Sequence, residues 1–373
     1  MNKISALQKA RAAYQPKLPP AFANGAMVKV IEGAKTSCVA DADKISQYFS
    51  ATFGSPELTF QPGQSGTLPA LTVGVILSGG QAPGGHNVIA GLYDGLKSLN
   101  PASKLYGFLK GPDGLIKGEQ ILLTDEIIDA YRNTGGFDMI GSGRTKLETE
   151  EHFKSAQKHC EELGIKSLVI IGGDDSNTNA CLLAEYYKKN GIGINVIGCP
   201  KTIDGDLKND CIETSFGFDT ACRVYSELIG NIGRDANSAK KYWHFIKLMG
   251  RSASHIALEC ALQTQPNIAI ISEEVAARKM TLKDLVENIA EVVAARADRG
   301  MNFGVALIPE GLIEFIPEMK TLIASLNDLL AQEAETFNSL FDTSEKLQFI
   351  SSRLSQDSSS AWIATRMATC RFR

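Results

Sequence analysis

Beyond residue 70, short apolar runs alternate along the chain with glycine-rich turns and amphipathic stretches. This alternation is typical of βα units, in which each strand joins a parallel sheet and each helix covers it. It predicts an α/β fold whose ligands bind where the strands end, because in open parallel sheets binding sites form at the carboxyl ends. Strands are expected at residues 71–77, 167–171, 195–198, 244–249, 267–271 and 304–308, and helices at 88–99, 150–163, 178–190, 254–263 and 282–296.

Residues 1–69 follow a different pattern. Prolines at 16, 19, 20, 56, 62 and 69 punctuate short helical stretches such as residues 41–49. A segment interrupted in this way is expected to be an extension or wrapping arm, not an independent core. Toward the other end, residues 313–349 are predicted to be helical, and the sequence contains no internal repeat.

The composition excludes several classes of partner. The chain has 373 residues, is 44% hydrophobic and 21% charged, and has a net charge of −4. A chain with this balance lacks the basic field that holds nucleic acid or an anionic membrane surface. No apolar run approaches the length of a membrane span, and eight cysteines without a CxxC pair indicate reduced thiols. We therefore expect a cytoplasmic protein with neither nucleic acid nor membrane as partner.

The first candidate motif is Leu77-Ser-Gly-Gly-Gln-Ala-Pro-Gly-Gly-His-Asn87, which joins a predicted strand to a predicted helix. Its four glycines would let backbone N–H groups approach an anion at the helix N-terminus. No Gly-Lys-Ser/Thr follows, so the segment is not a Walker loop. A tight turn without a ligand is the alternative. His86 and Asn87 are expected to be first-turn residues and not catalysts.

Two acids form the second motif, Gly172-Gly-Asp-Asp-Ser176, directly after a predicted strand. Asp174 offers the oxygen ligand that Mg²⁺ prefers. Adjacent carboxylates beside a phosphate loop would repel a polyanion unless a metal ion or a lysine neutralised them. The motif therefore favours a complex of Mg²⁺ with phosphate, and a solvated acidic turn is the alternative.

The third motif, Cys199-Pro-Lys-Thr-Ile-Asp-Gly-Asp206, combines a cation, a hydroxyl and two carboxylates after the next strand. Transfer of a phosphoryl group to a hydroxyl needs a base near that oxygen and a cation for the developing charge. Asp204 and Lys201 fit these two roles. The Asp-Gly pair is equally common in simple turns, so this motif read alone leaves both interpretations open.

Three shorter motifs end with a charged residue beside glycine. Met249-Gly-Arg251 follows a fourth strand, where an arginine can hold phosphate oxygens with two hydrogen bonds. Gly141-Ser-Gly-Arg144 is a second small-residue turn, and Pro309-Glu-Gly311 places an acid at the end of a later strand. Each motif by itself is weak evidence for a binding site, and the evidence becomes stronger because the motifs follow successive strands in order.

In this order, the motifs resemble those of the phosphofructokinases over about residues 70–315, and the combination is highly specific. The arm with Tyr14-Gln-Pro-Lys-Leu-Pro19 is similar to that of the long pyrophosphate-dependent branch. The resemblance implies a phosphofructokinase-like α/β fold with two Rossmann-like parallel-sheet domains, the second incomplete. The implied domains are an N-terminal extension at 1–69, a phosphate-donor and magnesium-binding domain at 70–216, a partial sugar-phosphate-binding domain with a helical insertion at 217–357, and an aberrant tail at 358–373.

The resemblance also implies roles for individual residues. Asp204 would accept the proton of the sugar 1-hydroxyl, and Asp174 would hold Mg²⁺ with Asp206 near the metal ion. Lys241 and Tyr242 resemble positions that reach a neighbouring subunit's site, which implies a homodimer or higher homo-oligomer. The other implied contacts are Gly79, Gly80 and Lys201 with the donor phosphates, Thr202, Ile203, Met249 and Gly250 with fructose 6-phosphate, Arg251 with the transferred group, and Glu310 with sugar hydroxyls.

The predicted donor depends on Asp175 and Lys201. ATP-dependent members of the family have glycine at both positions. A carboxylate at 175 would occupy the space of the nucleotide α-phosphate and repel it, while the Lys201 ammonium suits the compact charge of pyrophosphate. The expected reaction is Mg²⁺-dependent, reversible transfer of phosphoryl from pyrophosphate to fructose 6-phosphate, giving fructose 1,6-bisphosphate.

Other functions stay open at this point. An ATP-dependent phosphofructokinase would require tolerance of Asp175 and Lys201. A truncated or regulatory subunit without turnover is a second alternative, although Asp204 and Asp174 are both present. A NAD or lipid kinase can share the Gly-Gly-Asp loop but is not expected to carry the Thr-Ile-Asp and Met-Gly-Arg motifs as well.

The last residues depart from the family. Long-branch members continue well past position 360, in a part that holds the sugar 6-phosphate with a histidine and arginines. Residues 358–373 lose helical periodicity, and residues 366–372 match what codons for a family-like Asp-Pro-His-Gly-Asn-Val-Gln-Val-Ser would give when read one base out. We therefore expect a reading-frame break, an incomplete sugar-binding domain and doubtful activity of the 373-residue form.

Overall fold

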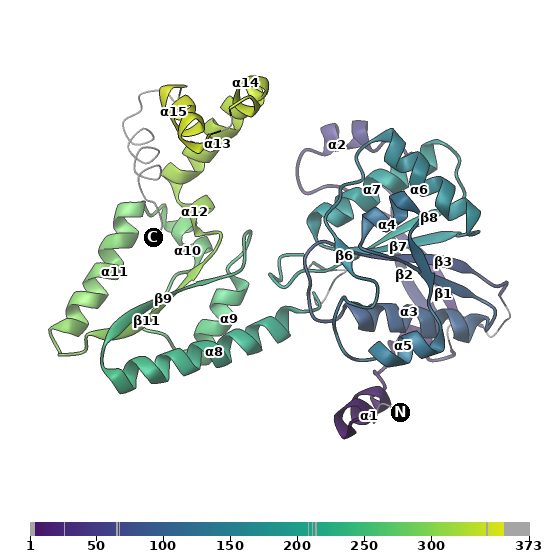
Figure 1. Ribbon diagram of the computed structural model, residues 1–373, viewed down its shortest axis with the longest axis horizontal. Coiled ribbons are helices and arrows are strands. Elements are labelled where there is room, and N and C mark those ends of the chain that lie inside the picture. The colour runs from purple at the N-terminus through teal and green to yellow at the C-terminus, as the bar shows by residue number, and fades with distance from the viewer. Residues whose placement is uncertain are drawn as a thin grey trace. The chain divides into compact units, whose positions relative to one another are not determined.

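The computed structural model describes residues 4–25, 27–64, 66, 68–207, 209–210, 212, 215–340 and 342–353. The chain divides into two units, drawn in purple to teal and in green to yellow in Figure 1. The second unit consists of Asp204–Asp206 and the residues that follow Gly217, and the rest of the chain forms the first. The boundary at Ile203 therefore cuts through the predicted Thr-Ile-Asp motif.

A mixed sheet with the order β5-β4-β3-β7-β8 forms the centre of the first unit. Its strands run parallel, apart from the antiparallel edge strand β5, and the short strand β6 pairs with the end of β3. Because β3, β7 and β8 are parallel neighbours, their carboxyl ends and the three motifs that follow them lie at one edge of the sheet. The strands are β3 Thr72–Ser78, β4 Lys104–Phe108, β5 Gln120–Leu122, β6 Ser142–Gly143, β7 Ser167–Gly172 and β8 Asn195–Pro200.

Helices cover both faces of this sheet. Alternate side chains of a strand point to opposite faces of the sheet, so one strand contributes residues to the hydrophobic clusters on both faces. Val75 and Leu77 of β3 pack into a cluster with α3 and α5, while Ile76 packs into another with α4, α6 and α7. Burial on both faces explains why these strands are continuous apolar runs. The helices are α3 Gly85–Leu99, α4 Pro112–Lys117, α5 Asp125–Tyr131, α6 Glu150–Glu162 and α7 Asp174–Lys189.

The N-terminal extension folds outside these clusters. Its two strands pair antiparallel in a separate ribbon, and its helices bury none of their residues. Hydrogen bonds fasten it to the body: the buried carboxylate of Glu185 on α7 accepts the N–H groups of Ala51 at 2.9 Å and Thr52 at 2.8 Å, and Asn133 Nδ2 donates to Arg11 O at 2.7 Å. Its elements are α1 Ala6–Ala13, η1 Pro20–Phe22, β1 Val28–Lys35, α2 Ala42–Tyr48 and β2 Pro56–Pro62.

The second unit contains a parallel sheet with the order β10-β11-β9. The middle strand β11 is buried, whereas the edge strand β9 exposes Tyr242 and Phe245. A cluster beneath β10 joins α10, α11 and α13. The elements are α8 Phe218–Ala239, β9 Tyr242–Leu248, α9 His255–Thr264, β10 Ile268–Ala269, α10 Ser272–Arg278, α11 Leu282–Ala297, β11 Phe303–Pro309, α12 Leu312–Phe315, α13 Pro317–Gln332, α14 Ala334–Asn338 and α15 Thr343–Arg353.

The predicted α/β class is confirmed, and every predicted strand has a counterpart. One boundary was wrong in a way that affects the site: α7 begins at Asp174, not at Thr178. Acids in the first turn of a helix are stabilised by its dipole, so the two aspartates extend the helix that we expected to follow them. The long helix α8 was not predicted. The expected aberrant tail, 358–373, lies outside the described residues.

Among the described residues, no helix combines the length and the apolar character that a membrane span requires.

Candidate functional site

The glycine loop after β3 depends on backbone space. Gly84 has a φ of +133°, and a Cβ there would lie 2.6 Å from the Phe216 ring. A Cβ on Gly85 would overlap Phe137. The loop can therefore pack against these two rings only because it has no side chains at 84 and 85. As predicted, His86 and Asn87 lie in the first turn of α3.

The N–H of Gly79 is already used within the protein, so what Gly79 offers a ligand is the open space beside its backbone. Its N–H already donates to Gly143 O at 2.9 Å, and its φ is +83°. A Cβ at this position would lie 3.5 Å from Ser176 Oγ and 3.9 Å from Lys201 Nζ. The predicted phosphate contact at Gly79 must therefore come from close approach of its backbone and not from its N–H.

Lys201 connects the loops that follow the three neighbouring strands. Its side chain is buried, its Nζ donates to Gly80 O at 2.7 Å, and its own N–H donates to Gly172 O at 2.8 Å. Next to it, Ser176 Oγ donates to Ser78 Oγ at 2.8 Å within the interior. The ammonium group is thus held in place among the glycine loops, which is where an anion-binding cation is needed.

The acid pair lies at the N-terminus of α7. Gly173 caps the helix, and Asp174 and Asp175 are exposed in its first turn. A Cβ on Gly173 would lie 3.9 Å from Lys201 Nζ. Asp174 and Asp175 are the next two residues after Gly173, so both acids follow directly on a position that is close to the buried ammonium. The helix dipole favours negative charge here by itself, which is the simplest explanation of two acids at this position.

Arg144 was only a weak candidate from the sequence, and the structure places it in this group. The strand before it, β6, pairs with Leu77 and Ser78 at the start of the glycine loop. A guanidinium nitrogen of Arg144 lies 3.4 Å from the position that a Cβ on Gly80 would take. Lys201 and Arg144 therefore both approach Gly80, and pairing of β6 with β3 is the contact that sequence reasoning could not detect.

Thr202 and Ile203 are the last residues of the first unit before the chain enters the second unit at Asp204. The backbone of Thr202 is fixed by Ser215, whose Oγ accepts its N–H at 3.0 Å and donates to its carbonyl at 2.6 Å. Ile203 is half-buried, and its side chain limits the space at Gly217, where a Cβ would lie 3.3 Å away.

In the second unit, Asp204 is a buried acid. Its Oδ2 accepts the backbone N–H of Arg251 at 3.4 Å, a long hydrogen bond. Burial raises the pKa of Asp204, and the charges of Asp206 and Glu310 raise it further, while the N–H and the charge of Arg251 lower it. A carboxylate with a raised pKa accepts a proton more readily than a solvated one, as a general base must.

The carboxyl ends of β9 and β11 bring the remaining predicted residues of this unit together. Glu310 N–H donates to Leu248 O at 2.8 Å, and Gly311 N–H donates to Gly250 O at 3.0 Å. Gly250 has a φ of +129°, and a Cβ there would lie 2.7 Å from Ala253 O. Met249, Arg251 and Glu310 are exposed at this edge and can reach a ligand.

Lys241 and Tyr242 lie elsewhere. They stand at the start of β9, whose far end carries Met249, and seven residues of strand separate the two ends by about 20 Å. Tyr242 is 68% exposed. The structure therefore does not bring this pair together with Arg251 of the same chain, and the role at a neighbouring subunit's site stays a prediction.

The donor set suits Mg²⁺ better than a metal that needs a protein cage. Among the described residues, no group of three or more histidine, cysteine or acidic side chains could hold a metal ion. Mg²⁺ usually takes one or two carboxylates, and phosphate oxygens and waters complete its octahedron. Exposed Asp174, within the phosphate loops, fits that pattern. In the second unit, Asp206 Oδ1 is buried without a hydrogen-bond partner.

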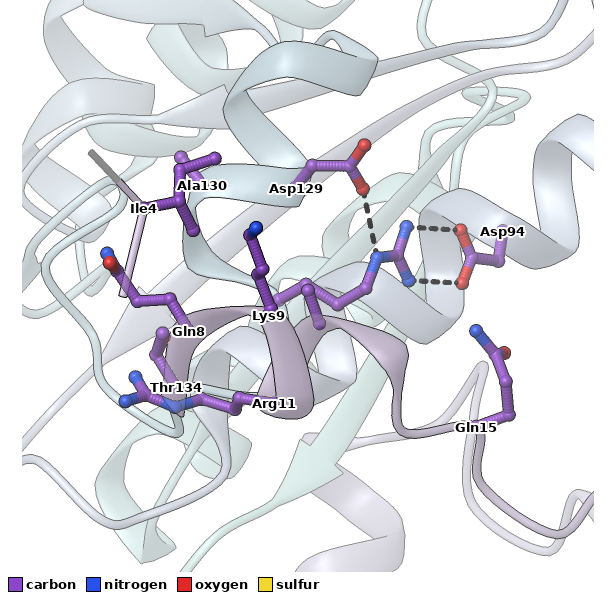
Figure 2. A pocket seen from close by; sticks show the side chains of 11 residues that line it. Ile4, Gln8, Lys9, Arg11, Gln15, Asp94, Asp129, Ala130 and Thr134 are labelled. Atoms are coloured by element: carbon purple, nitrogen blue, oxygen red, sulfur yellow. Dashed lines mark hydrogen bonds and ion pairs between the residues drawn. The ribbon is translucent and has the colours of Figure 1, made fainter. Parts of the chain in front are cut away.

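A separate cavity of about 930 Å³ lies beside α1 (Figure 2). Arg132 on its wall bonds to Asp94 at 2.7 Å and to Asp129 at 3.0 Å, so the guanidinium is already neutralised. Its lining residues come from α1 and its flanks, from α3, and from the end of α5 and the residues just after it, and the predicted site residues are not among them.

Comparison with known proteins identifies the family of the chain. The phosphofructokinase family model matches residues 72–357, so the chain belongs to the phosphofructokinase family. The predicted resemblance and the predicted fold class are thereby confirmed.

Individual relatives carry more specific names than the family model. The chain is 63% identical over 356 residues to a pyrophosphate–fructose 6-phosphate 1-phosphotransferase of Porphyromonas gingivalis, covering 95% of this chain and 64% of that protein. It is 52% identical to the β subunit of the potato (Solanum tuberosum) enzyme of the same name, covering 88% of this chain and 58% of that subunit. The chain thus spans somewhat less than two thirds of the length of these relatives.

The fold also matches solved structures. The crystal structure of a pyrophosphate-dependent phosphofructokinase from Marinobacter aquaeolei superposes with a TM-score of 0.54 at 21% identity, covering 66% of this chain and 63% of that one. At this identity the likeness supports the fold alone.

Proposed function

We propose that this chain carries the phosphoryl-transfer machinery of a pyrophosphate-dependent phosphofructokinase. The reaction is reversible transfer of phosphoryl from pyrophosphate to the 1-hydroxyl of fructose 6-phosphate, giving fructose 1,6-bisphosphate and phosphate. The observation that carries the proposal is the buried Lys201 ammonium, bonded to Gly80 O among the glycine loops. Close relatives bear the name of this reaction.

Donor choice follows from charge and space at the same loops. Lys201 fills the region beside Gly79 and Gly173, within 3.9 Å of the positions where their Cβ atoms would lie. A compact diphosphate can use this ammonium directly, whereas the α-phosphate of a nucleotide would need room and would meet the Asp175 carboxylate. An ATP-dependent reaction is the less favoured alternative for this reason.

The acceptor side of the proposed reaction uses the second unit. Asp204 takes the proton of the sugar hydroxyl as that oxygen attacks phosphorus. Its raised pKa, caused first by burial, makes the carboxylate a stronger base than a solvated aspartate. In this proposal Arg251 balances charge on the transferred group, and Glu310 accepts hydrogen bonds from sugar hydroxyls.

Mg²⁺ is the proposed cofactor, with Asp174 as its protein ligand. When bound, the ion would neutralise part of the negative charge of the donor phosphates. The other roles in the proposed reaction fall to side chains of this protein. Lys201 and Arg144 bind oxygens of the donor phosphates, and Asp204 accepts the proton of the sugar hydroxyl.

A homo-oligomer is proposed as the working form. The potato relative is named as one kind of subunit, so at least that relative acts in an assembly. Exposed Tyr242, at the far end of β9 from Met249, is free to reach a ligand of another subunit.

The experiment that tests the proposal is a donor exchange. The variant Asp175→Gly/Lys201→Gly should lose pyrophosphate affinity by roughly 10- to 100-fold, because one charge-assisted bond is lost, and should gain activity with ATP. Lys158→Ala on α6, with a 69% exposed side chain, is the control and should leave both donors unchanged. A variant that still prefers pyrophosphate by the wild-type ratio contradicts the role given to these two residues.

A further inference from the structure

His86 is a fully buried histidine that the proposed reaction does not use. It lies in the first turn of α3, directly behind the glycine loop. Its ring packs edge-on against Tyr131, and its hydrogen-bonding atoms face residues 134–139. Nδ1 lies 2.6 Å from Thr134 Oγ1, and Nε2 accepts the N–H of Met139 at 3.0 Å. The N–H of Gly136 also points at Nδ1, at 3.1 Å.

These contacts select a neutral ring. Backbone N–H groups donate to both ring nitrogens, from Gly136 to Nδ1 and from Met139 to Nε2. A doubly protonated ring could accept neither hydrogen bond, so these contacts favour the neutral imidazole. Burial lowers the pKa of His86, while exposed Asp138, 3.4 Å from Nε2, works in the opposite direction.

The segment held by His86 borders the glycine loop along its whole length. Gly84 N–H donates to Gly135 O at 2.7 Å, and His86 N–H donates to Gly136 O at 3.0 Å. At the other end, Gly79 N–H donates to Gly143 O. Arg144 follows directly and approaches Gly80. The imidazole thus braces the start of the segment that ends in Arg144.

We propose that His86 is a positioning residue: its neutral imidazole fixes residues 134–143 against the glycine loop and so sets where the Arg144 guanidinium meets the donor phosphates. The last step rests on the proposed function, whereas the bracing of residues 134–143 does not. A leucine of similar bulk would fill the space but leave the buried Met139 N–H without an acceptor, which costs a full desolvation penalty.

Hydrogen exchange tests the bracing directly. In His86→Leu, peptides covering residues 133–141 should exchange roughly ten-fold faster than in the wild type, because the local opening free energy falls. In His86→Gln, whose side-chain oxygen can reach the Met139 N–H, most of the protection should return. His159→Gln on α6 is the control histidine. Unchanged exchange in His86→Leu overturns the proposal.

Ring nitrogen spectra test the neutral state of the imidazole. With only five histidines in the chain, ¹⁵N-labelled imidazoles can be resolved by NMR. His86 should show one protonated and one unprotonated ring nitrogen, and it should stay neutral below the ordinary histidine pKa of 6.5. A doubly protonated ring at pH 6 contradicts the assignment.

Calorimetry with magnesium pyrophosphate tests the link to Arg144. His86→Leu should bind roughly ten-fold more weakly than the wild type, and the double variant His86→Leu/Arg144→Ala no more weakly than Arg144→Ala alone, since both changes act through one contact. Additive losses overturn the link. A wild type that binds no pyrophosphate refutes the proposed function, and the exchange result still decides the bracing.

Discussion

The two units place polar chemistry at the carboxyl ends of parallel strands, but they hold it differently. In the first unit, Lys201 is bonded to the backbone of the loops from neighbouring strands. In the second, the buried Asp204 accepts the backbone N–H of Arg251 at 3.4 Å, and burial raises its pKa. The difference teaches that the first unit fixes a buried cation with backbone hydrogen bonds, whereas the second holds a buried acid whose pKa is raised by its burial.

The largest effect is expected from removing the base. Asp204→Asn should lower kcat about 10³-fold, because the amide cannot accept the hydroxyl proton. Asp219→Asn, in the first turn of α8, is the control of the same unit and should be near wild type. The measurement is steady-state turnover with pyrophosphate, on variants that elute and melt as the wild type does. A kcat within ten-fold of wild type would mean that another group takes the proton.

The rigid frame of the first unit is tested by glycine replacement. Gly84→Ala should reduce the free energy of unfolding by roughly 3 kcal/mol, since φ is +133° and the new Cβ meets Phe216. Gly91→Ala on the same helix has open space around its Cβ and should be neutral or slightly stabilising. Chemical denaturation compares the pair. Equal stability of the two variants would show that the loop is not constrained.

The fastening of the extension to the first unit should depend on pH. Burial alone would raise the pKa of Glu185, but hydrogen bonds from Ala51, Thr52 and Lys189 lower it to about 2 from 4.5. A depressed folded-state pKa adds stability that is complete above 4.5 and is lost as the pH falls toward 2.

Glu185→Gln should remove about 2 kcal/mol of this contribution near neutral pH, together with most of its acid dependence. Limited proteolysis within residues 1–69 reports release of the extension, with Glu162→Gln on α6 as control. An extension cut at the same rate in both variants would show that Glu185 does not fasten it.

The smallest effect concerns the acid limb of activity. Glu310 raises the pKa of Asp204, so Glu310→Gln should lower that pKa and shift the loss of kcat/KM toward lower pH. The shift is toward lower pH because Asp204 must be ionised to accept the proton, and with a lower pKa it stays ionised at lower pH. A pH-rate profile of this variant beside Glu314→Gln measures the shift, and a shift to higher pH would contradict the electrostatic account.

Much of this fold could be predicted because the buried strands carry their own signal. β3 and β7 are apolar runs that lead into glycine-rich turns, which is the pattern that predicted parallel strands and the order of the motifs. α8 was missed because Gly230, Asn231 and Gly233 break its helical pattern, and its buried face is only Cys222, Ile229 and Ala236. Tertiary packing stabilises such a helix where local propensity does not.

The kinds of residue in the candidate site could be predicted from the sequence, but the contacts between them could not. Lys201 and Asp204 were found because glycine and charged residues follow apolar strands. The place of Arg144 depends on pairing between β6 and β3, and the bracing by His86 depends on a segment about 50 residues away. Contacts between distant segments leave no local pattern, so sequence alone could treat His86 only as a first-turn residue.

The most direct test of the central claim is a ³¹P NMR experiment with this chain, Mg²⁺ and fructose 6-phosphate. Added pyrophosphate should be consumed as signals of inorganic phosphate and of the sugar 1-phosphate grow together, and added ATP should stay intact. Consumption of ATP with pyrophosphate left unchanged would contradict the donor assignment to Asp175 and Lys201.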